Sequence, residues 1–292
     1  GLLLDGIGDT IRVSLSEEPE AEIPVARLLV SYIGERAEAA AIQAVESTKY
    51  SRYEYIRRTT HAVGNIGGEN VPVVFADKDG GFSTIPDYLL VDNHVLSTNG
   101  DTYPVFEADY IQTLLSDSSA IKFLKLEYAD LTPELIGILN ESTDIVVLLS
   151  TSHPNGVGEQ RAFFHTLLNE GCTVPVVLCR SYAETDLQHL QIKAATDLGV
   201  LFIDGFGDGI FLENKGNIGV EAVCSVAFGI LQGSRVRITK TEYVSCPSCG
   251  RTMFNLQTVI ARIKARTSHL KGLKIGIMGC IVNGPGEMAD AD

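Results

Sequence analysis

Short apolar runs alternate with longer amphipathic segments from residue 1 to about residue 235 of this 292-residue chain. The apolar runs are continuous, which is typical of strands buried on both faces of a sheet. They predict strands at Leu2–Leu4, Pro72–Phe75, Tyr88–Val91, Lys122–Leu126, Ile145–Leu149, Val174–Leu178 and Leu201–Ile203. The segments between them predict helices that include Ile23–Ile33, Pro133–Asn140, Gln160–Glu170 and Leu187–Leu198. This order indicates an α/β fold with a parallel sheet covered by helices, either open or closed into a barrel.

The pattern changes over residues 241–292. Strands are predicted at Glu242–Ser245 and Leu273–Met278. Between them, spacings of three and four predict an amphipathic helix. Its apolar positions are Leu256, Val259, Ile260, Ile263 and Leu270. Cysteines follow both strands, so a parallel pairing of the strands would bring them together. These cysteines are Cys246, Cys249 and Cys280.

A glycine- and proline-rich turn stands close to the last of these cysteines. Glu287 follows Asn283-Gly284-Pro285-Gly286, in which the glycines permit a tight reversal and the proline stiffens it. Three thiolates and a carboxylate suit an iron–sulfur cluster, which needs four ligands and usually takes thiolates. A carboxylate would be the exchangeable ligand, so that one iron could accept a substrate atom. On spacing alone, a solvated loop position is the simpler interpretation of Glu287.

Two other kinds of cysteine chemistry fit the pattern less well. A thioredoxin-like pair would head a helix after the first strand of its own domain, and it would leave Cys280 unexplained. A structural zinc site needs a fourth Cys or His, and the nearest, His269, is predicted to lie on the helix away from the strand ends. A non-catalytic α/β scaffold with such a zinc site remains the alternative hypothesis.

The other cysteines lie in apolar stretches and are expected to pack as small hydrophobic residues. They are Cys172, Cys179 and Cys224. The chain has no regular cysteine framework, which points to a reducing compartment.

One short internal repeat is visible. Leu2-Leu3-Leu4-Asp5-Gly6-Ile7-Gly8-Asp9 reappears 199 residues later as Leu201-Phe202-Ile203-Asp204-Gly205-Phe206-Gly207-Asp208. Each copy is predicted to be a strand, a glycine loop and a helix, and the repeat indicates a duplicated barrel-like domain. Arg12 and Ser14, two residues apart on one side of an extended segment, could hold phosphate oxygens. An ordinary solvated strand end explains them equally well. Phe211 and Glu213 occupy the matched positions, and a carboxylate there would repel phosphate.

Charge is distributed unevenly over a chain whose formal net charge is −14. Residues 236–292 hold 8 Lys and Arg against 4 Asp and Glu, whereas residues 1–235 hold 15 against 33. A basic patch around the cysteines would attract an anionic substrate or an acidic electron-carrier protein. A solvated helix face is an equally good explanation. We expect no nucleic-acid partner for so acidic a chain, and no membrane partner, because no apolar run approaches the roughly 18 residues of a span.

The strings YVSCPSCGRT and IMGCIVNGPGEMADAD closely resemble the iron–sulfur domain of the 4-hydroxy-3-methylbut-2-enyl diphosphate synthase family, in the methylerythritol phosphate route to isoprenoids. GLLLDGIGDTIRVSL resembles the end of that family's TIM barrel. The residues between them match the long form of the family, which carries an extra barrel-like domain. The resemblance implies three parts. These are the C-terminal end of a substrate-binding TIM barrel (1–35), a TIM-barrel-like insert with parallel strands (36–237) and an incomplete α+β [4Fe–4S] domain (238–292).

The resemblance also implies roles for individual residues. The [4Fe–4S] ligands would be Cys246, Cys249, Cys280 and Glu287, and Glu287 would be the exchangeable, catalytic one. Arg12 and Ser14 would hold the substrate diphosphate, and Asn283 would contact substrate near the cluster.

The activity implied is a two-electron reductive ring opening of 2-C-methyl-D-erythritol 2,4-cyclodiphosphate with loss of water. Electrons would come from ferredoxin or flavodoxin, and the enzyme would be a homodimer in which one subunit's cluster domain closes over its partner's barrel. Bacterial cytoplasm is the expected location, with a plastid stroma as the alternative. Since the family's barrel begins upstream and its cluster domain continues downstream, we expect this polypeptide to be a fragment without full activity.

Overall fold

The structure is a computed structural model that describes residues 1–15, 17, 19–51, 53–77, 80–245, 252, 254–282, 284–289 and 291–292, without the side chains of Pro19, Pro285 and Glu287. The chain divides into two compact units. One consists of Gly34–Arg237 and the other of Gly1–Ile33 together with Ile238–Asp292. We call them the barrel unit and the cysteine unit and describe each by itself.

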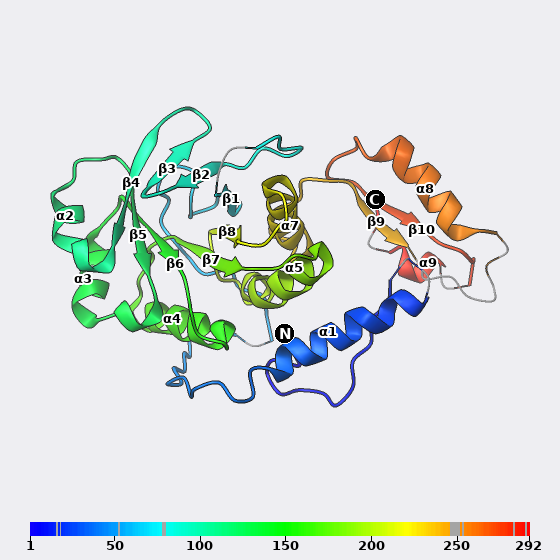
Figure 1. The fold of residues 1–292 in the computed structure, drawn as a ribbon, viewed down its shortest axis with the longest axis horizontal. Coiled ribbons are helices and arrows are strands. Elements are labelled where there is room, and N and C mark those ends of the chain that lie inside the picture. Colours follow the sequence, from blue (N-terminus) through cyan, green and yellow to red (C-terminus); the bar gives the residue numbers. More distant parts are fainter. Residues whose placement is uncertain are drawn as a thin grey trace. The chain divides into compact units, whose positions relative to one another are not determined.

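Eight strands of the barrel unit close into a barrel, drawn from cyan to yellow-green in Figure 1. Their bounds are β1 Val73–Ala76, β2 Tyr88–Val91, β3 His94–Ser97, β4 Thr102–Glu107, β5 Lys122–Leu126, β6 Ile145–Leu149, β7 Val176–Tyr182 and β8 Gly209–Asn214. Neighbouring strands are parallel, and β8 closes the ring by pairing with β1, except that β3 runs antiparallel to β2 and β4. The predicted α/β barrel is therefore confirmed, and the all-parallel sheet is wrong at β3.

The reversal at β3 follows from the length of its connection to β2. Only Asp92 and Asn93 separate the two strands, and Asp92 has a φ of 52°. A two-residue loop with a positive φ at its first position makes a tight hairpin, which joins antiparallel strands, whereas a parallel crossover needs a dozen residues or more.

Helices follow most of the later strands and cover the outside of the barrel (Figure 1). Their bounds are α2 Ile111–Ser116, α3 Pro133–Glu141, α4 Gly156–Glu170, α5 Leu187–Ala194, α6 Val200–Ile203 and α7 Val220–Gly233. The helix α3 begins where the Thr132 hydroxyl accepts a hydrogen bond from the Leu135 N–H at 3.2 Å, an N-cap that satisfies one otherwise unpaired donor. Among the residues that the structure describes, no helix is both long and apolar enough to cross a membrane.

The barrel interior is filled by side chains that alternate along the strands. Phe75 stacks on Tyr88 with ring centroids 4.9 Å apart and meets Phe123 edge-on at 5.9 Å. Val63 and Ile66, paired across a small turn, are buried in the same cluster. Cys172, Cys179 and Cys224 are all buried, which confirms their prediction as packed hydrophobic residues.

One predicted strand is a helix. Leu201–Ile203 lies in α6, which continues from α5 through a π-helical turn at Ala195–Gly199. The helix ends in a Schellman motif, in which the Phe206 N–H bonds to the Leu201 carbonyl at 2.9 Å and Gly205 has a φ of 85°. Short apolar runs do not distinguish a buried helix from a strand. The strand of this region is β8, which the sequence analysis missed.

The first copy of the repeat has the same local structure, so its predicted strand at Leu2–Leu4 is also wrong. Ile7 N–H bonds to the Leu2 carbonyl at 2.9 Å, and Gly6 has a φ of 71°. These contacts match those of the second copy at the offset of 199 residues. The match continues without a gap, because α1 (Glu22–Gly34) coincides with α7 at the same offset, give or take one residue. The repeated unit is thus a glycine turn, an extended segment and a helix, and in the second copy α6 precedes the turn.

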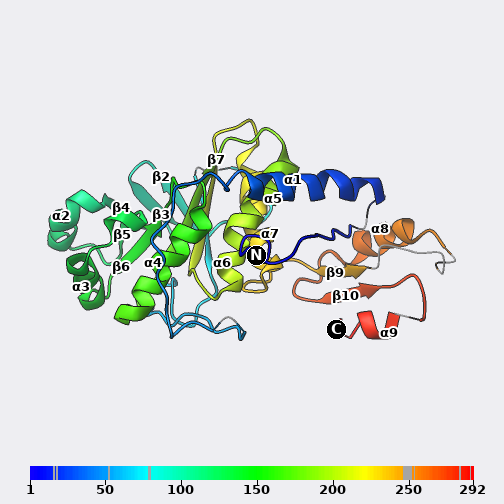
Figure 2. The ribbon, with the colours of Figure 1, turned by 90° about the horizontal axis from the view of Figure 1, so that it is seen from below.

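The cysteine unit contains two parallel strands, β9 (Glu242–Ser245) and β10 (Lys274–Ile277), paired residue for residue from Glu242–Lys274 to Ser245–Ile277. The helix α8 (Leu256–Thr267) connects them, and Leu256 and Ile260 pack on Ile277 in a small core. Both strands and the parallel pairing confirm the predictions, but α8 ends three residues before Leu270. Figure 2 shows α8 on one side of the strands and the short α9 (Gly284–Glu287) on the other.

Candidate metal centre and barrel mouth

The parallel strands β9 and β10 direct two cysteine positions to the same edge of their sheet. Ser245 pairs with Ile277, so the chain leaves both strands at one end. Cys246 comes directly after Ser245, and Cys280 lies three residues after Ile277. Cys280 is half-buried. The structure does not describe Cys246 or Cys249, and Asn283 also lies outside the described residues.

A close contact brings the two loops of this edge together. A Cβ atom built on Gly279 would lie 2.5 Å from the Thr252 hydroxyl, so only glycine fits between Cys280 and Met278. Thr252 follows the Cys-Pro-Ser-Cys segment by three residues. The loop after β9 therefore packs against the residue that precedes Cys280.

The chain beyond Cys280 folds back along β10. A Cβ atom built on Gly276 would lie 2.9 Å from the Met288 side chain. The Asp292 carboxylate accepts a hydrogen bond from the Lys274 N–H at 2.8 Å. The expected turn at Gly284–Glu287 is one turn of helix, α9, with the Met288 N–H bonded to the Gly284 carbonyl at 2.9 Å. The backbone at Glu287 thus lies on a returning segment, while its side chain is not described.

The donor set at this edge suits a thiolate-bound group. Within the part of the chain that the structure describes, no three His, Cys, Asp or Glu residues stand close enough to hold a metal ion. A metal site that includes Cys280 would need donors outside the described side chains, and Cys246, Cys249 and Glu287 are candidates. His269 is exposed near the end of α8, where Thr267 and Leu270 carbonyls accept hydrogen bonds from Thr241 at the start of β9. It lies at the opposite end of the strands, away from the cysteines as predicted, but two residues beyond the end of α8 rather than on the helix.

Arg12 and Ser14 are both exposed on an extended segment of the cysteine unit. At the offset of 199 residues this segment corresponds to β8, with Arg12 matching Phe211 and Ser14 matching Glu213. The position of Phe211 and Glu213 in the barrel unit therefore shows where residues at this place in the repeat lie in a closed barrel.

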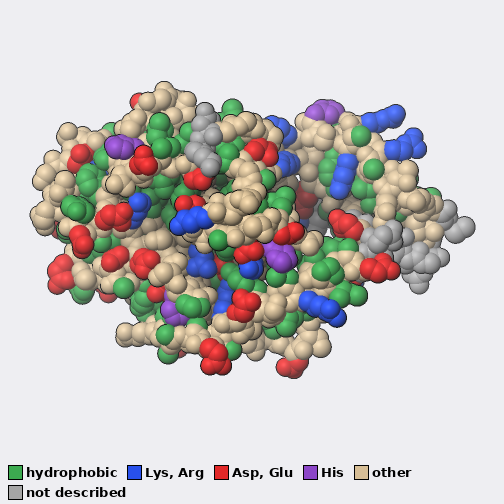
Figure 3. Space-filling view, viewed as in Figure 1, with side chains coloured by type: hydrophobic (Ala, Val, Ile, Leu, Met, Phe, Trp, Pro, Cys, Tyr) green, Lys and Arg blue, Asp and Glu red, His purple; other side chains and the backbone are tan. Residues whose placement is uncertain are grey.

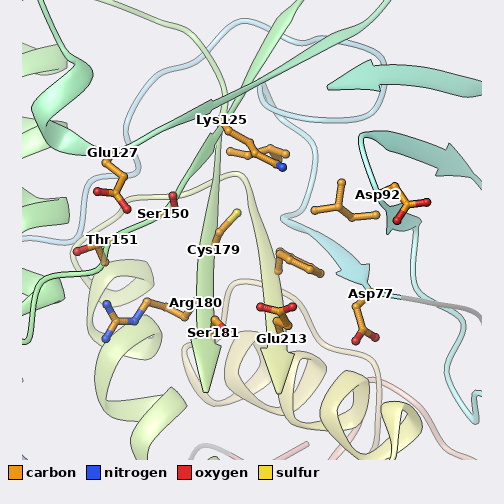
Figure 4. A pocket seen from close by; sticks show the side chains of 13 residues that line it. Asp77, Asp92, Lys125, Glu127, Ser150, Thr151, Cys179, Arg180, Ser181 and Glu213 are labelled. Carbon is orange, nitrogen blue, oxygen red and sulfur yellow. The ribbon is translucent and has the colours of Figure 1, made fainter. Parts of the chain in front are cut away.

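Phe211 and Glu213 line a cavity of about 570 Å³ at the carboxyl end of the barrel strands. Figure 4 shows the labelled side chains around this mouth, with Cys179 between Lys125 and Glu213 in the view. Catalytic and binding residues of barrel enzymes lie at this end. Of these lining residues, the repeat in the sequence points only to Phe211 and Glu213. The other polar residues could have been found because each lies at or just after the end of a strand: Asp77, Asp92, Lys125, Glu127, Ser150, Thr151, Arg180 and Ser181.

The cations of the mouth are already paired with carboxylates. Lys125 Nζ lies 2.9 Å from Glu107, and Arg180 lies 2.9 Å from Asp197, which is buried and also binds Arg36 and the Tyr182 hydroxyl. Burial raises the pKa of the Cys179 thiol to about 12, so this sulfur is protonated and a poor nucleophile at neutral pH. The mouth carries a surplus of carboxylates, which disfavours phosphate.

Comparison with known proteins finds similar sequences both for the cysteine-bearing segment and for the whole chain. The model of the GcpE protein C-terminal domain matches residues 242–292, the segment with both strands and all three candidate cysteine ligands. A 4-hydroxy-3-methylbut-2-en-1-yl diphosphate synthase (flavodoxin) of Parabacteroides distasonis is 52% identical over all of this chain and 51% of its own length. Enzymes of the same name from Porphyromonas gingivalis and Leptospira interrogans are 46% and 32% identical over the whole chain.

Fold and site together define an α/β-barrel protein with an added cysteine-bearing unit. The chain spans about half the length of the curated relatives that it matches. At 52% identity over its full length, it belongs to the 4-hydroxy-3-methylbut-2-en-1-yl diphosphate synthase family. This membership disfavours the alternative of a non-catalytic zinc scaffold.

Proposed function

We propose that this chain is the cluster-bearing part of an enzyme that opens the ring of 2-C-methyl-D-erythritol 2,4-cyclodiphosphate. Two electrons and two protons enter, one C–O bond of the ring breaks to free the diphosphate, a hydroxyl leaves as water, and 4-hydroxy-3-methylbut-2-enyl diphosphate is the product. The observation that carries the proposal is the in-register parallel pairing of β9 and β10, with Ser245 opposite Ile277. It supports a common edge for thiolates that lie 34 residues apart in sequence, at Cys246 and Cys280.

The proposed ligands of a [4Fe–4S] cluster are Cys246, Cys249, Cys280 and Glu287. Glu287 supplies the exchangeable oxygen ligand and is therefore the catalytic residue of the set. The cluster, when bound, delivers electrons and offers one iron as a Lewis acid to a substrate oxygen. Two contacts support this donor set: Thr252 against Gly279, and Met288 against Gly276. Both hold loops that carry proposed ligands close to β10.

The proposed diphosphate ligands are Arg12 and Ser14, with Asn283 as a further substrate contact near the cluster. The support for the first two comes from the repeat, because their counterparts Phe211 and Glu213 line the mouth of a barrel. Arg12 would bind phosphate oxygens through its planar fork and Ser14 would donate through its hydroxyl. Binding the diphosphate fixes the reacting carbon and converts an encounter into an intramolecular step.

The names of the relatives specify flavodoxin, and we propose a flavodoxin as the electron donor here as well. Ferredoxin is the alternative carrier. The barrel unit is proposed as an insert at residues 36–237, between the end of a substrate barrel at 1–35 and a cluster domain that begins at 238. In the whole enzyme, we propose a homodimer in which a cluster domain closes over the partner's substrate barrel. Bacterial cytoplasm is the proposed location.

Anaerobic reconstitution with iron and sulfide tests the proposal. We expect a brown protein with about four iron and four sulfide per chain, the composition of one cubane cluster. An enzyme extended to the full length of the relatives should then convert the cyclodiphosphate with a small chemical reductant. A colourless protein that binds one zinc instead would contradict the proposed function and restore the scaffold alternative.

A further inference from the structure

The segment from Thr252 to Val282 carries Arg262, Lys264, Arg266, Lys271 and Lys274 and contains neither Asp nor Glu. This is unusual in a chain with 37 acidic residues and 23 basic ones. Figure 3 shows Lys and Arg side chains gathered over the part of the cysteine unit that contains α8. Part of this positive charge thus lies on the face seen in that view.

One side of α8 combines this charge with apolar groups. Val259, Arg262, Ile263 and Arg266 are spaced by three and four and so lie in one stripe of the helix. With Thr267 they line a groove of about 370 Å³. Val259 and Ile263 are half-buried against the small core, whereas both arginines are exposed.

Within the described residues, no ion pair or hydrogen bond explains the two arginines. Neither Arg262 nor Arg266 forms an ion pair or hydrogen bond with another described residue, whereas Lys264 lies 5.4 Å from the Tyr243 ring centroid and Lys274 pairs through its backbone with Asp292. Arg266 is close to the helix C-terminus, where a cation gains a few tenths of a kcal/mol from the helix dipole. That contribution does not require arginine, nor does it explain Arg262 one turn earlier.

We propose that the α8 stripe, defined by Val259, Arg262, Ile263 and Arg266, is the docking surface for an acidic electron-carrier protein. The proposal rests on the proposed function and names where its electron donor binds. A positive rim steers an acidic partner and sets its orientation, while a small apolar centre gives a short-lived contact. Weak redox complexes bury less than about 1,200 Å² in total, and one helix face with its flanking lysines is of that order.

The placement of α8 suits this role. Its N-terminal residue Leu256 packs against Ile277, the last residue of β10 before the loop to Cys280. Arg262 lies six residues further on, or about 9 Å at 1.5 Å of rise per residue. A protein bound to the stripe would therefore contact a surface that begins near the cysteine edge of the same unit.

The test compares two electron donors in the full-length enzyme with reconstituted cluster. With Arg262→Glu/Arg266→Glu, we expect the flavodoxin concentration for half-maximal rate to rise at least tenfold. The rate with dithionite-reduced methyl viologen, which needs no protein docking, should stay within twofold of the parent. Each single variant should show an intermediate effect, and Arg262→Lys/Arg266→Lys should retain flavodoxin-driven turnover because charge carries the steering. Lys215→Glu is the matched control for each single Arg→Glu variant, with the same change of charge at a 68% exposed side chain of the barrel unit.

Raised ionic strength should weaken flavodoxin-driven turnover in the parent and have a smaller effect in the double variant, since screening acts on the same charges. Unchanged flavodoxin dependence in the double variant would overturn the docking surface. So would equal loss with both donors, which would assign the arginines to folding or to the reaction itself. If the parent enzyme fails even with methyl viologen, the proposed function fails, and direct binding of oxidised flavodoxin to parent and variants still decides the docking surface.

Discussion

The two units of this chain hold themselves together in different ways. In the barrel unit, eight strands close on an interior where Phe75, Phe123 and Val146 are almost completely buried. In the cysteine unit, two strands and α8 enclose a small buried cluster of Leu256, Ile260 and Ile277 among the described residues. A two-stranded sheet with so small a core is marginal by itself, and a bound metal group that cross-links its loops can supply the missing stability. Hydrophobic contacts hold the barrel unit together, whereas the small core described for the cysteine unit is consistent with the proposed cluster as a further source of stability.

The largest expected effect is on the iron and sulfide bound by the cysteine unit. Cys280→Ser should remove nearly all bound iron and sulfide after anaerobic reconstitution, because a hydroxyl is a poor substitute for a thiolate on iron. Cys179→Ser is the matched control, since its buried sulfur lies in the barrel unit and should leave the iron content unchanged. Iron and labile sulfide analysis gives the result. Equal iron content in Cys280→Ser and the parent would remove Cys280 from the proposed site.

The next effect separates the two cores. Phe123→Ala empties a fully buried position inside the barrel and should lower its free energy of unfolding by about 3–5 kcal/mol. Phe254→Ala in the cysteine unit removes a ring that is 47% exposed and should change stability by less than about 0.5 kcal/mol. Urea unfolding of the 292-residue chain measures both variants. A comparable loss in Phe254→Ala would show that the exposed ring contributes to a core.

Alkaline pH should destabilise the barrel unit selectively. Burial raises the pKa of Cys179 to about 12, and burial with nearby Tyr103 raises that of Tyr88 to about 12. Because these groups ionise more easily when unfolded, their contribution is intact at neutral pH. It is lost as the pH rises from about 8.5 for the thiol and about 10 for the phenol toward 12. For each of these groups, once it is fully ionised in the unfolded state, the free energy of unfolding falls by about 1.4 kcal/mol per pH unit.

Stability against urea from pH 8 to 11 checks this slope, and Cys179→Ala should reduce it while lowering stability at pH 7. A slope that Cys179→Ala leaves unchanged would assign the alkaline loss to other groups.

The smallest effect compares equivalent helix caps. Thr132→Ala in the barrel unit and Asn255→Ala in the cysteine unit each remove an N-cap, whose acceptors lie 3.2 and 2.9 Å from the Leu135 and Thr258 N–H groups. Each should cost about 1 kcal/mol. Hydrogen exchange should show faster opening along all of α8 for Asn255→Ala, but only at the start of α3 for Thr132→Ala, because the barrel core holds α3 in place. Equal local effects would argue that the two units are similarly supported.

Much of the fold could be predicted from the order of residues. Tyr88–Val91, Lys122–Leu126 and Ile145–Leu149 are strands with the predicted bounds. Their apolar runs are continuous because both faces are buried, so the burial is recorded in adjacent residues. The cysteine edge was predicted for the same reason, since strand ends and parallel pairing follow from two short runs and the helix between them.

The errors lie where distant residues decide. The run at Leu201–Ile203 becomes a helix end because a glycine turn terminates it. Only glycine fits at Gly205, because the Ile56 carbonyl oxygen would lie 2.2 Å from a Cβ at that position. The strand β8 forms because Gly209 fits between Val73 of β1 and Val177 of β7. Residues this far apart leave no periodic signal in the sequence.

By itself, the sequence determined the α/β class, the strands beside the cysteines, and the set of candidate ligands, because each depends on a local pattern or on residue chemistry. Only the tertiary structure decided that the barrel closes, that β3 reverses, and that Phe211 and Glu213 line a carboxylate-rich mouth. It also revealed that the apolar run before each glycine turn of the repeat is not a strand. These features depend on which segments pack against one another, and that is settled by burial and close approach between residues far apart in the chain.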